Sequence, residues 1–431
     1  MKHGNFPTAR LKQAVDPSRP ITYGIVQCGP DVSPNGIPYV RPVDMTDEGG
    51  VDVGGLRHTS PEIAAPYRRS VVRAGDLVVS IGPSFGKVMV VPEAIDGGNL
   101  TQGTARVAAG PRMAPRFLFW ALRSKPVAHA WDASCNGATF RALTLWGLGE
   151  APVPMPPLPT QRAIADFLDR KTAAIDALIE KKQKLLDLLA EKRAALINQA
   201  VTKGLDPNVP MKDSGIPWIG EIPAHWEVKR LALLTRLIQT GPFGSQLHAE
   251  AYIEGGVPVV NPTNLVPPRI EPDTRKTVDD ATAQRLSRHC LETGDLVFAR
   301  RGALGRCGLV SRDEAGWLCG TGSLIVRLDT DRVIPEFVAW LAQTTWVAEW
   351  LSLQSVGSTM DNLNTQILGR LPLPTPPKAE QVQIVRGLVS LLTRQDGAIG
   401  NLTNSIDRLV EYRQALITAA VTGELDLEVD E

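Results

Sequence analysis

The sequence predicts an α+β protein in which two duplicated α+β domains are separated by two long helices that form an antiparallel coiled coil. Three observations predict this plan: a long internal repeat, β-branched runs between turns at the front of each repeat, and a heptad-like apolar pattern at the back of each. A chain of 431 residues also exceeds what one hydrophobic core usually organises. At least two domains are therefore expected.

The repeat is visible as matching blocks at a constant shift of 220 residues. GIPYVRP at 36–42 recurs as GVPVVNP at 256–262, and EKRAALINQAVTKGLD at 191–206 recurs as EYRQALITAAVTGELD at 411–426. Solenoid units have only roughly 20 to 50 residues, so this period indicates a duplicated domain with a duplicated connector. The predicted boundaries are a first domain at 1–157, a long helix at 158–204, a second domain at 205–377, and a long helix with a tail at 378–431.

The front part of each repeat is predicted to mix strands with a helix. The runs 75–80 and 295–299 are β-branched and follow turn residues, as short strands do. Aromatic-rich stretches at 116–131 and 336–350 each predict one helix. We interpret their aromatic side chains as core packing and not as a cofactor site.

The back part of each repeat begins after prolines, at 152–159 or 372–377, where a helix cannot continue. The 3.5-residue spacing of a coiled-coil seam then follows. The first copy carries Ile164, Leu168, Ile175, Leu178, Leu185, Leu189 and Leu196, and the second carries Ile384, Leu388, Leu391, Ala398, Leu402, Ile406, Leu409, Leu416 and Ala420. Such long apolar stripes need a partner helix, so we expect the two helices to pair antiparallel with one domain at each end.

Composition excludes several classes of protein. Forty-six basic side chains balance 46 acidic ones, which argues against a sequence-independent nucleic-acid coat but leaves local basic patches open. No apolar run approaches the roughly 18 residues of a membrane helix, and Met1–Arg10 has no signal-peptide pattern, so a cytoplasmic protein is expected. The five cysteines form no C-x-x-C pair, which indicates neither a disulfide framework nor a zinc site.

Candidate catalytic motifs fail on inspection. Gly82–Val88 resembles a phosphate-binding loop but has too few residues between its glycines and lacks the final Ser or Thr. Asn261–Asn264 lacks the second proline and the aromatic residue of an amino-methyltransferase motif. Glu180–Lys182 lies in the predicted coiled coil, and the histidines have no metal-ligand spacing. We predict no catalytic residue, no metal site and no cofactor of the chain's own.

A duplicated domain on a rigid spacer suits the recognition of two short DNA sequences at a fixed distance. Arginine can bind guanine with both arms of its fork, and asparagine or glutamine can bind adenine. The candidates are Arg41, Arg57, Arg68, Arg69, Arg73 and Arg141 in the first domain, and Gln246, Asn261, Asn264, Arg269, Arg300, Arg301, Arg306, Asn362 and Asn364 in the second. For any one of them, a surface or loop-capping role is the alternative.

Several motifs together carry a resemblance to a known family. KDSGIPWIGEIPAHWEV at 212–228 resembles the opening of a target-recognition domain in type I restriction-modification specificity subunits, and TGPFGSQL at 240–247 resembles its next signature. YGIVQ at 23–27 and the helix starts at Gln161 and Gln381 fit the same family. The resemblance spans nearly the whole chain.

The resemblance implies a non-catalytic subunit whose two domains each recognise one half of a split target in double-stranded DNA. It also implies that the coiled coil sets the gap and docks two methyltransferase subunits, which restriction and translocase subunits join. S-adenosylmethionine, ATP and Mg²⁺ would then bind to the partner subunits.

One departure from the family concerns the start of the first domain. Nothing upstream of Tyr23 matches 212–226, which indicates a trimmed domain or a start assigned too late. Two other functions stay open. A free-standing DNA methyltransferase or nuclease with integral recognition domains would need a cofactor loop, and a coiled-coil scaffold that binds only protein would gain no affinity from any DNA sequence.

Overall fold

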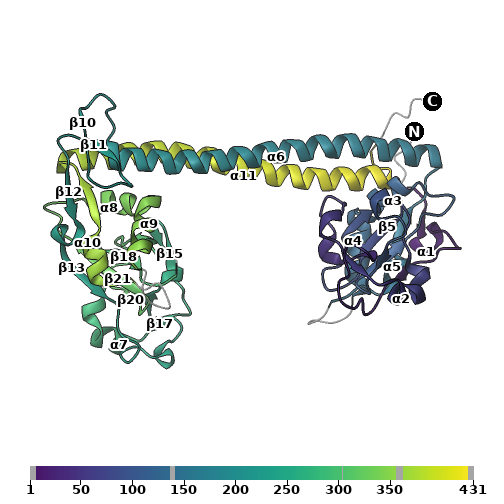
Figure 1. The fold of residues 1–431 in the computed structure, drawn as a ribbon, viewed down its shortest axis with the longest axis horizontal. Coiled ribbons are helices and arrows are strands. Elements are labelled where there is room, and N and C mark those ends of the chain that lie inside the picture. The colour runs from purple at the N-terminus through teal and green to yellow at the C-terminus, as the bar shows by residue number, and fades with distance from the viewer. Residues whose placement is uncertain (1–5, 136–140, 303, 356–362, 426–431) are drawn as a thin grey trace. The chain divides into compact units, whose positions relative to one another are not determined.

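The computed structural model describes residues 6–135, 141–302, 304–355 and 363–425. The chain divides into two compact units: unit 1 comprises 1–183 and 403–431, and unit 2 comprises 184–402. Each unit contains a globular α+β domain together with parts of the two long helices α6 (Leu158–Lys203) and α11 (Lys378–Thr422) (Figure 1).

The domain of unit 1 is built on an antiparallel sheet of order β2-β8-β5-β6, beside a smaller sheet of order β4-β3-β7 in which β3 and β7 are parallel. The strands are β2 (Thr22–Tyr23), β8 (Thr104–Val107), β5 (Leu77–Ser80), β6 (Val88–Val90), β4 (Arg57–Thr59), β3 (Ile37–Val40) and β7 (Asn99–Leu100). The α-helices are α1 (Leu11–Ala14), α2 (Pro61–Ala64), α3 (Pro115–Leu122), α4 (Lys125–Ser134) and α5 (Leu145–Glu150). The short 3-10 helices include η1 (Pro42–Asp44) and η3 (Ala65–Ser70).

The domain of unit 2 repeats this plan with sheets of order β13-β21-β18-β19 and β17-β14-β20. The strands are β13 (Thr235–Thr240), β21 (Ser323–Leu328), β18 (Leu296–Ala299), β19 (Cys307–Leu309), β17 (Thr277–Val278), β14 (Val257–Val260) and β20 (Leu318–Cys319). Two hairpins are added, β10 (Met211–Asp213) with β11 (Glu221–Pro223) and β15 (Leu265–Val266) with β16 (Arg269–Ile270). The α-helices are α7 (Asp280–Arg285), α8 (Pro335–Ala342), α9 (Thr345–Gln354) and α10 (Thr365–Arg370), and the 3-10 helices include η7 (Pro262–Asn264) and η8 (Ser287–His289).

The duplication extends further upstream than the sequence indicates. β1 (Thr8–Arg10) pairs with β9 (Pro152–Pro154), and β12 (Glu227–Arg230) pairs with β22 (Pro372–Thr375) in the same antiparallel register. The first domain therefore begins its repeat at Thr8 and not near Tyr23. Sequence comparison missed this because a short strand at the edge of a domain is held by backbone pairing, which many side chains satisfy.

The helix predicted over 116–131 is two helices, α3 and α4, and the one predicted over 336–350 is α8 and α9. Ser124 and Thr344 occupy the equivalent breaks, where their hydroxyls donate to the carbonyls of Ala121 (2.6 Å) and Leu341 (2.7 Å). A side chain that bonds back to the preceding turn competes with the helical backbone pattern, so each helix ends there. The aromatic residues are nevertheless core, since Trp120 and Trp131 are at most 2% exposed.

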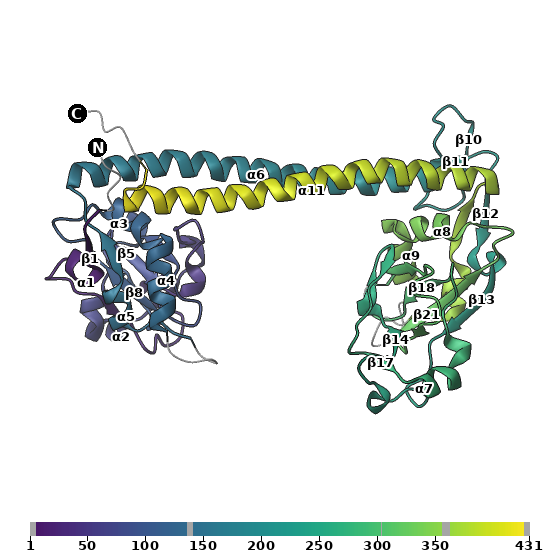
Figure 2. The ribbon, with the colours of Figure 1, turned by 180° about the vertical axis from the view of Figure 1, so that it is seen from behind.

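In each unit α6 and α11 run side by side in opposite directions (Figures 1 and 2). In unit 1, Arg413 Nε lies 2.8 Å from Asp176 Oδ1, and the start of α6 shares a core cluster with the end of α11. In unit 2, Arg193 Nη1 lies 2.6 Å from Asp396 Oδ1, and the end of α6 shares a cluster with the start of α11. Both pairings follow from the apolar stripes along these helices.

Four of the expected seam positions are on the solvent side. Leu178, Leu185 and Leu391 are 43%, 44% and 44% exposed, and Ala398 is exposed as well. Their neighbours are less exposed: Ile179, Leu186, Leu392 and Ile399. A spacing of 3.5 is not a whole number of residues, so at every second step two adjacent residues are alternative seam positions. At these four positions the prediction took the more exposed residue of the two. The other seam residues are buried or half-buried, namely Ile164, Leu168, Ile175, Leu189, Leu196, Ile384, Leu388, Leu402, Ile406, Leu409, Leu416 and Ala420.

A fully buried glutamine joins the start of each long helix to its own domain. The Oε1 atom of Gln161 accepts from the Ala114 amide (2.8 Å), and its Nε2 atom donates to the carbonyls of Arg112 (3.0 Å) and Pro156 (2.8 Å). Gln381 makes the same three contacts in unit 2. Each side chain is 0% exposed, so the helix start is fixed by a saturated polar contact inside the core.

Replacing Gln381 with Ala should lower the free energy of unfolding by about 3 kcal/mol, because one buried donor and two buried acceptors lose their partner. Urea denaturation of the full chain measures this effect. Gln199→Ala is the matched control, since Gln199 is exposed on α6 and should change stability by less than about 0.5 kcal/mol. Equal stability of the two variants would contradict the assigned role.

Among the described residues, no helix combines the length and the apolar character that crossing a membrane requires.

Candidate nucleic-acid interface

The first predicted contact residue, Arg41, binds its own turn. Its Nη2 and Nε atoms lie 2.6 and 3.0 Å from the carboxylate oxygens of Asp44, and its backbone amide donates to Asp44 Oδ2 (2.7 Å). The hydrogen bonds of the Arg41 guanidinium to Asp44 raise the pKa of Arg41. Asn261 and Asn264 cap the equivalent turn in unit 2, where the Asn261 amide donates to Asn264 Oδ1 (2.9 Å). The two domains therefore have the same turn at equivalent places and hold it with different polar side chains.

The remaining candidates of unit 1 lie on its surface. Arg57 is exposed on β4, and Arg68 and Arg69 are exposed on η3. Arg141 Nη2 lies 2.9 Å from Asp132 Oδ1, and its guanidinium carbon lies 5.7 Å from the centre of the Phe85 ring. The structure does not gather these four arginines at one place: only Arg68 and Arg69 line the same hollow.

The candidates of unit 2 lie mainly in loops. The Oε1 atom of Gln246 accepts from the Phe243 amide (3.0 Å), and Asn364 caps α10 by accepting from the Ile367 amide (2.8 Å). Arg269 is exposed on β16, Arg300 is half-buried after β18, and Arg301 beside it is exposed. Asn362 lies outside the described residues.

In each domain a hairpin loop brings a basic residue to the capped turn, which lies at 41–44 in unit 1 and at 261–264 in unit 2. Lys87 Nζ donates to the Met45 carbonyl (3.0 Å), and Arg306 Nη1 donates to the Pro262 carbonyl (3.4 Å). Gly86 and Gly305 precede these residues with φ of +97° and +84°, which a side chain would strain. The segment that resembled a phosphate-binding loop is thus the turn between β5 and β6.

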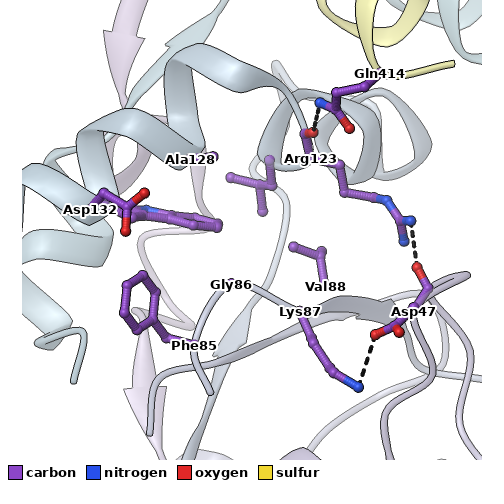
Figure 3. A pocket seen from close by; sticks show the side chains of 11 residues that line it. Asp47, Phe85, Gly86, Lys87, Val88, Arg123, Ala128, Asp132 and Gln414 are labelled. Atoms are coloured by element: carbon purple, nitrogen blue, oxygen red, sulfur yellow. Dashed lines mark hydrogen bonds and ion pairs between the residues drawn. The ribbon is translucent and has the colours of Figure 1, made fainter. Parts of the chain in front are cut away.

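A hollow of about 420 Å³ lies beside the loop in unit 1 (Figure 3). Phe85 and Trp131 supply aromatic walls, and the indole N–H of Trp131 has no partner among the described residues. The carboxylate of Asp47 lies 2.9 Å from Lys87 Nζ. The backbone carbonyl of Asp47 accepts a hydrogen bond from Arg123 Nη2 (2.6 Å). Burial lowers the pKa of Arg123 to about 10, so it remains a cation at neutral pH. These groups suit binding of a polar planar group and offer no paired nucleophile and base.

A second hollow of unit 1, of about 610 Å³, collects Arg68, Arg69 and Arg73 with Arg19 and Arg106. Sequence reasoning missed the last two residues. The available signal was the arginine inside the strand sequence TARV at 104–107, where a buried strand otherwise carries small or apolar residues. Among the described residues, no group of three or more His, Cys, Asp and Glu side chains could hold a metal ion.

His289 of unit 2 is 4% exposed on η8, where unit 1 has Ser70. Its Nδ1 atom lies 2.9 Å from Gln239 Nε2, and its Nε2 atom has no partner among the described residues. Burial lowers the pKa of His289 below 6.5. The folded chain therefore holds a neutral imidazole at a pH where the unfolded chain begins to take up a proton.

The free energy of unfolding should consequently decrease as the pH falls below about 6.5. At pH 5.5 the decrease is at most about 1.4 kcal/mol, which is the limit for the uptake of one proton over one pH unit. His289→Gln should remove this part of the pH dependence, whereas the exposed His248→Gln should not. Urea midpoints at pH 7.5 and 5.5 measure the difference. A wild-type pH dependence in His289→Gln would show that His289 does not contribute.

A family model described as "Type I restriction modification DNA specificity domain" matches residues 31–187 and 223–408. The chain is 34% identical over 170 residues to the EcoBI specificity subunit of Escherichia coli, which covers 39% of this chain and 35% of that protein. It is 23% identical over 278 residues to the EcoKI specificity subunit of Escherichia coli K12, covering 63% of this chain and 57% of that one. The chain thus aligns with about a third to just over half of these relatives' length.

Two solved structures share the fold. A chain from a study of complex assembly and conformational transition in the type I R-M system superposes with a TM-score of 0.68, at 20% identity and over 98% of both chains. The HsdS subunit from Thermoanaerobacter tengcongensis superposes with a TM-score of 0.54, at 18% identity and over 98% of this chain and 97% of that one. At these identities the likeness establishes the fold alone.

Proposed function

The chain belongs to the type I restriction modification DNA specificity family, and from this premise we propose that it is the sequence-recognition subunit of a type I restriction-modification complex. In this proposal the domains at 1–157 and 205–377 each bind one half of a split target in double-stranded DNA. The long helices at 158–204 and from 378 onward form the spacer.

The observation that carries the proposal is that two domains with one backbone plan differ in polar residues at equivalent places. The capped turn uses Arg41 with Asp44 in unit 1 and Asn261 with Asn264 in unit 2. Different capping side chains hold the equivalent loops in different ways, and the exposed polar residues of the two domains differ as well, so two unlike half-sites are expected. Any candidate that caps a loop, as Arg41 does, would contribute to base recognition only by holding that loop.

The apolar stripes of α6 and α11 support a coiled-coil spacer, which we propose also docks two methyltransferase subunits and through them the restriction and translocase subunits. We further propose that S-adenosylmethionine, ATP and Mg²⁺ bind to those partners, because this sequence lacks the loops that hold such groups. The chain itself then performs no catalysis, and the complex works in the cytoplasm, where the host DNA lies.

A binding experiment separates this function from that of a protein-only scaffold. The chain, purified with its methyltransferase subunit, is mixed with fragmented host DNA, and the retained fragments are sequenced. One split motif should be enriched, with an affinity at least about 10³-fold above that for random DNA. If DNA fragments were retained without enrichment of any sequence, the result would contradict the proposal and favour a protein-only scaffold. A methylation activity of the chain alone would favour the free-standing enzyme instead.

A further inference from the structure

The hollow of about 610 Å³ in unit 1 has an excess of positive charge. Arg19 forms a two-pronged pair with Asp76, with its Nη1 atom 2.8 Å from Asp76 Oδ1. Arg68, Arg69 and Arg73 are exposed, and their side chains have no hydrogen bond or ion pair with any described residue. Like-charged side chains repel one another, and Asp76 and Asp16 offset only part of this positive charge, so an anion would bind favourably among the arginines.

A buried arginine also lines this hollow. Arg106 is 4% exposed; its Nη1 atom donates to the Val71 carbonyl (2.9 Å) and its Nη2 atom to the Pro20 carbonyl (3.2 Å). Its Nε atom has no partner among the described residues. Arg106 hydrogen-bonds to two carbonyls and to no carboxylate among the described residues, so the more distant Asp76 and Asp16 offset its charge only in part.

The second domain shows that the strand does not need this charge. Arg106 pairs across the sheet with Val78, and the equivalent pair in unit 2 is Ile325 with Val297. An isoleucine therefore fills the same position in a strand of the same register. The arginine is specific to unit 1 and is not required by the fold.

Two of the three rim arginines have diverged in the same direction. GDLV at 75–78 and at 294–297 aligns the two segments at a shift of 219 residues. At this shift Arg68 corresponds to Ser287 and Arg73 to Glu292, whereas Arg69 corresponds to another arginine, Arg288. Glu292 pairs with Arg327, whose Nη1 atom lies 2.5 Å from Glu292 Oε1. Unit 2 thus keeps one of the three rim arginines and adds a carboxylate where unit 1 concentrates positive charge.

We propose that this hollow of unit 1 binds a phosphate group of the DNA backbone, without regard to base sequence. The guanidinium fork matches the geometry of phosphate oxygens, and Arg68, Arg69 and Arg73 are free to turn their forks toward one. Phosphate contacts position a protein on the duplex while base contacts specify the site. The inference rests on the proposed function, to which it adds a sequence-independent anchor present in the first domain only.

The test compares two triple variants of the full chain. R68Q/R69Q/R73Q removes the rim of the hollow, and R112Q/R162Q/R170Q removes the same charge from exposed arginines elsewhere in unit 1. Each binds a random-sequence duplex and a target-containing duplex at 50 to 200 mM salt. The slope of log K against log salt should become less steep by about two for the rim variant and by less than about one for the control. Affinity for both duplexes should fall by the same factor, about tenfold or more at low salt. Equal slopes for the two variants would overturn the inference, since only general charge would then matter.

A second measurement identifies the source of the phosphate. Inorganic phosphate is titrated into the wild-type chain and the rim variant, and phosphorus resonance broadening reports binding. Competition between phosphate and the random duplex, lost in the rim variant, supports the backbone site. Phosphate binding lost in that variant with unchanged duplex affinity would assign the hollow to a free phosphate or nucleotide and overturn the DNA anchor.

The outcomes also separate this inference from the proposed function. Enrichment of a split target by both the wild type and the rim variant, with identical salt slopes, would refute the anchor and leave the specificity role intact. Failure of the wild-type chain to bind any duplex, with or without its methyltransferase subunit, would refute both.

Discussion

Deleting one heptad from each long helix, residues 179–185 of α6 and 404–410 of α11, is expected to change the gap of the DNA target and leave both half-site sequences unchanged. A heptad preserves the 3.5-residue seam, so the helices should still pair. Seven residues at about 1.5 Å each span about 10.5 Å, which corresponds to at most about three base pairs at 3.4 Å. Affinity for the original target should fall toward the level for random DNA, about 10³-fold or more.

The control for this change removes the heptad from α6 alone. The two helices then differ in length, and the expected result is lower stability instead of a new target. Selection of bound fragments from host DNA measures the gap for both variants. An unchanged gap in the double deletion, with the chain folded, would refute the spacer role of the helices.

Replacing Trp226 with Ala is expected to lower the free energy of unfolding by about 4 kcal/mol, the typical cost of removing a fully buried aromatic side chain. Trp226 is 0% exposed in the core of unit 2, and its indole Nε1 atom donates to Glu380 Oε1 (3.1 Å) at the start of α11. The change creates a cavity and removes one of the contacts of the Glu380 carboxylate. The contact that remains is with His225, whose Nε2 atom lies 2.8 Å from Glu380 Oε2.

Trp218 is the matched control because it belongs to the same motif and is 41% exposed. Trp218→Ala should change stability by less than about 1 kcal/mol, and Trp226→Phe should recover part of the loss. Urea denaturation of the three variants measures these differences. A cost for Trp226→Ala no larger than that for Trp218→Ala would contradict its role as the contact between the second domain and its helix.

Sequence reasoning predicted what repeats and periodicity encode. The shift of 220 residues predicts two domains of one plan, and β9 and β22 occupy matching places in that plan. The apolar pattern predicts long helices near the observed limits of α6 and α11. Both features follow from many residues that act together, so single deviations do not obscure them.

Features decided by one contact escaped prediction. The break between α3 and α4 depends on the Ser124 hydroxyl bonding back to Ala121, and the choice between Leu178 and Ile179 depends on which side of α6 faces α11. Whether Arg41 contacts DNA or caps its turn depends on Asp44, three residues away. Such outcomes are set by tertiary contacts that local pattern does not contain.

The candidate interface was predictable by residue type and not by position. Arg68 and Arg69 were singled out because arginine suits DNA, but the hollow that they share with Arg19 and Arg106 forms only in the fold. Arg106 lies in a buried strand, where a sequence pattern predicts an apolar side chain. The comparison of two diverged copies on one scaffold identified it, because the equivalent position holds Ile325.

The most direct test of the specificity role is single-molecule sequencing of methylated adenines in the host genome, with and without this gene. The expected result is the loss of one split motif, two short unlike half-sites around a fixed gap, with every other methylated motif retained. Restoring the gene should restore that motif alone. An unchanged set of methylated sites, in cells shown to express the chain and its methyltransferase subunit, would contradict the account.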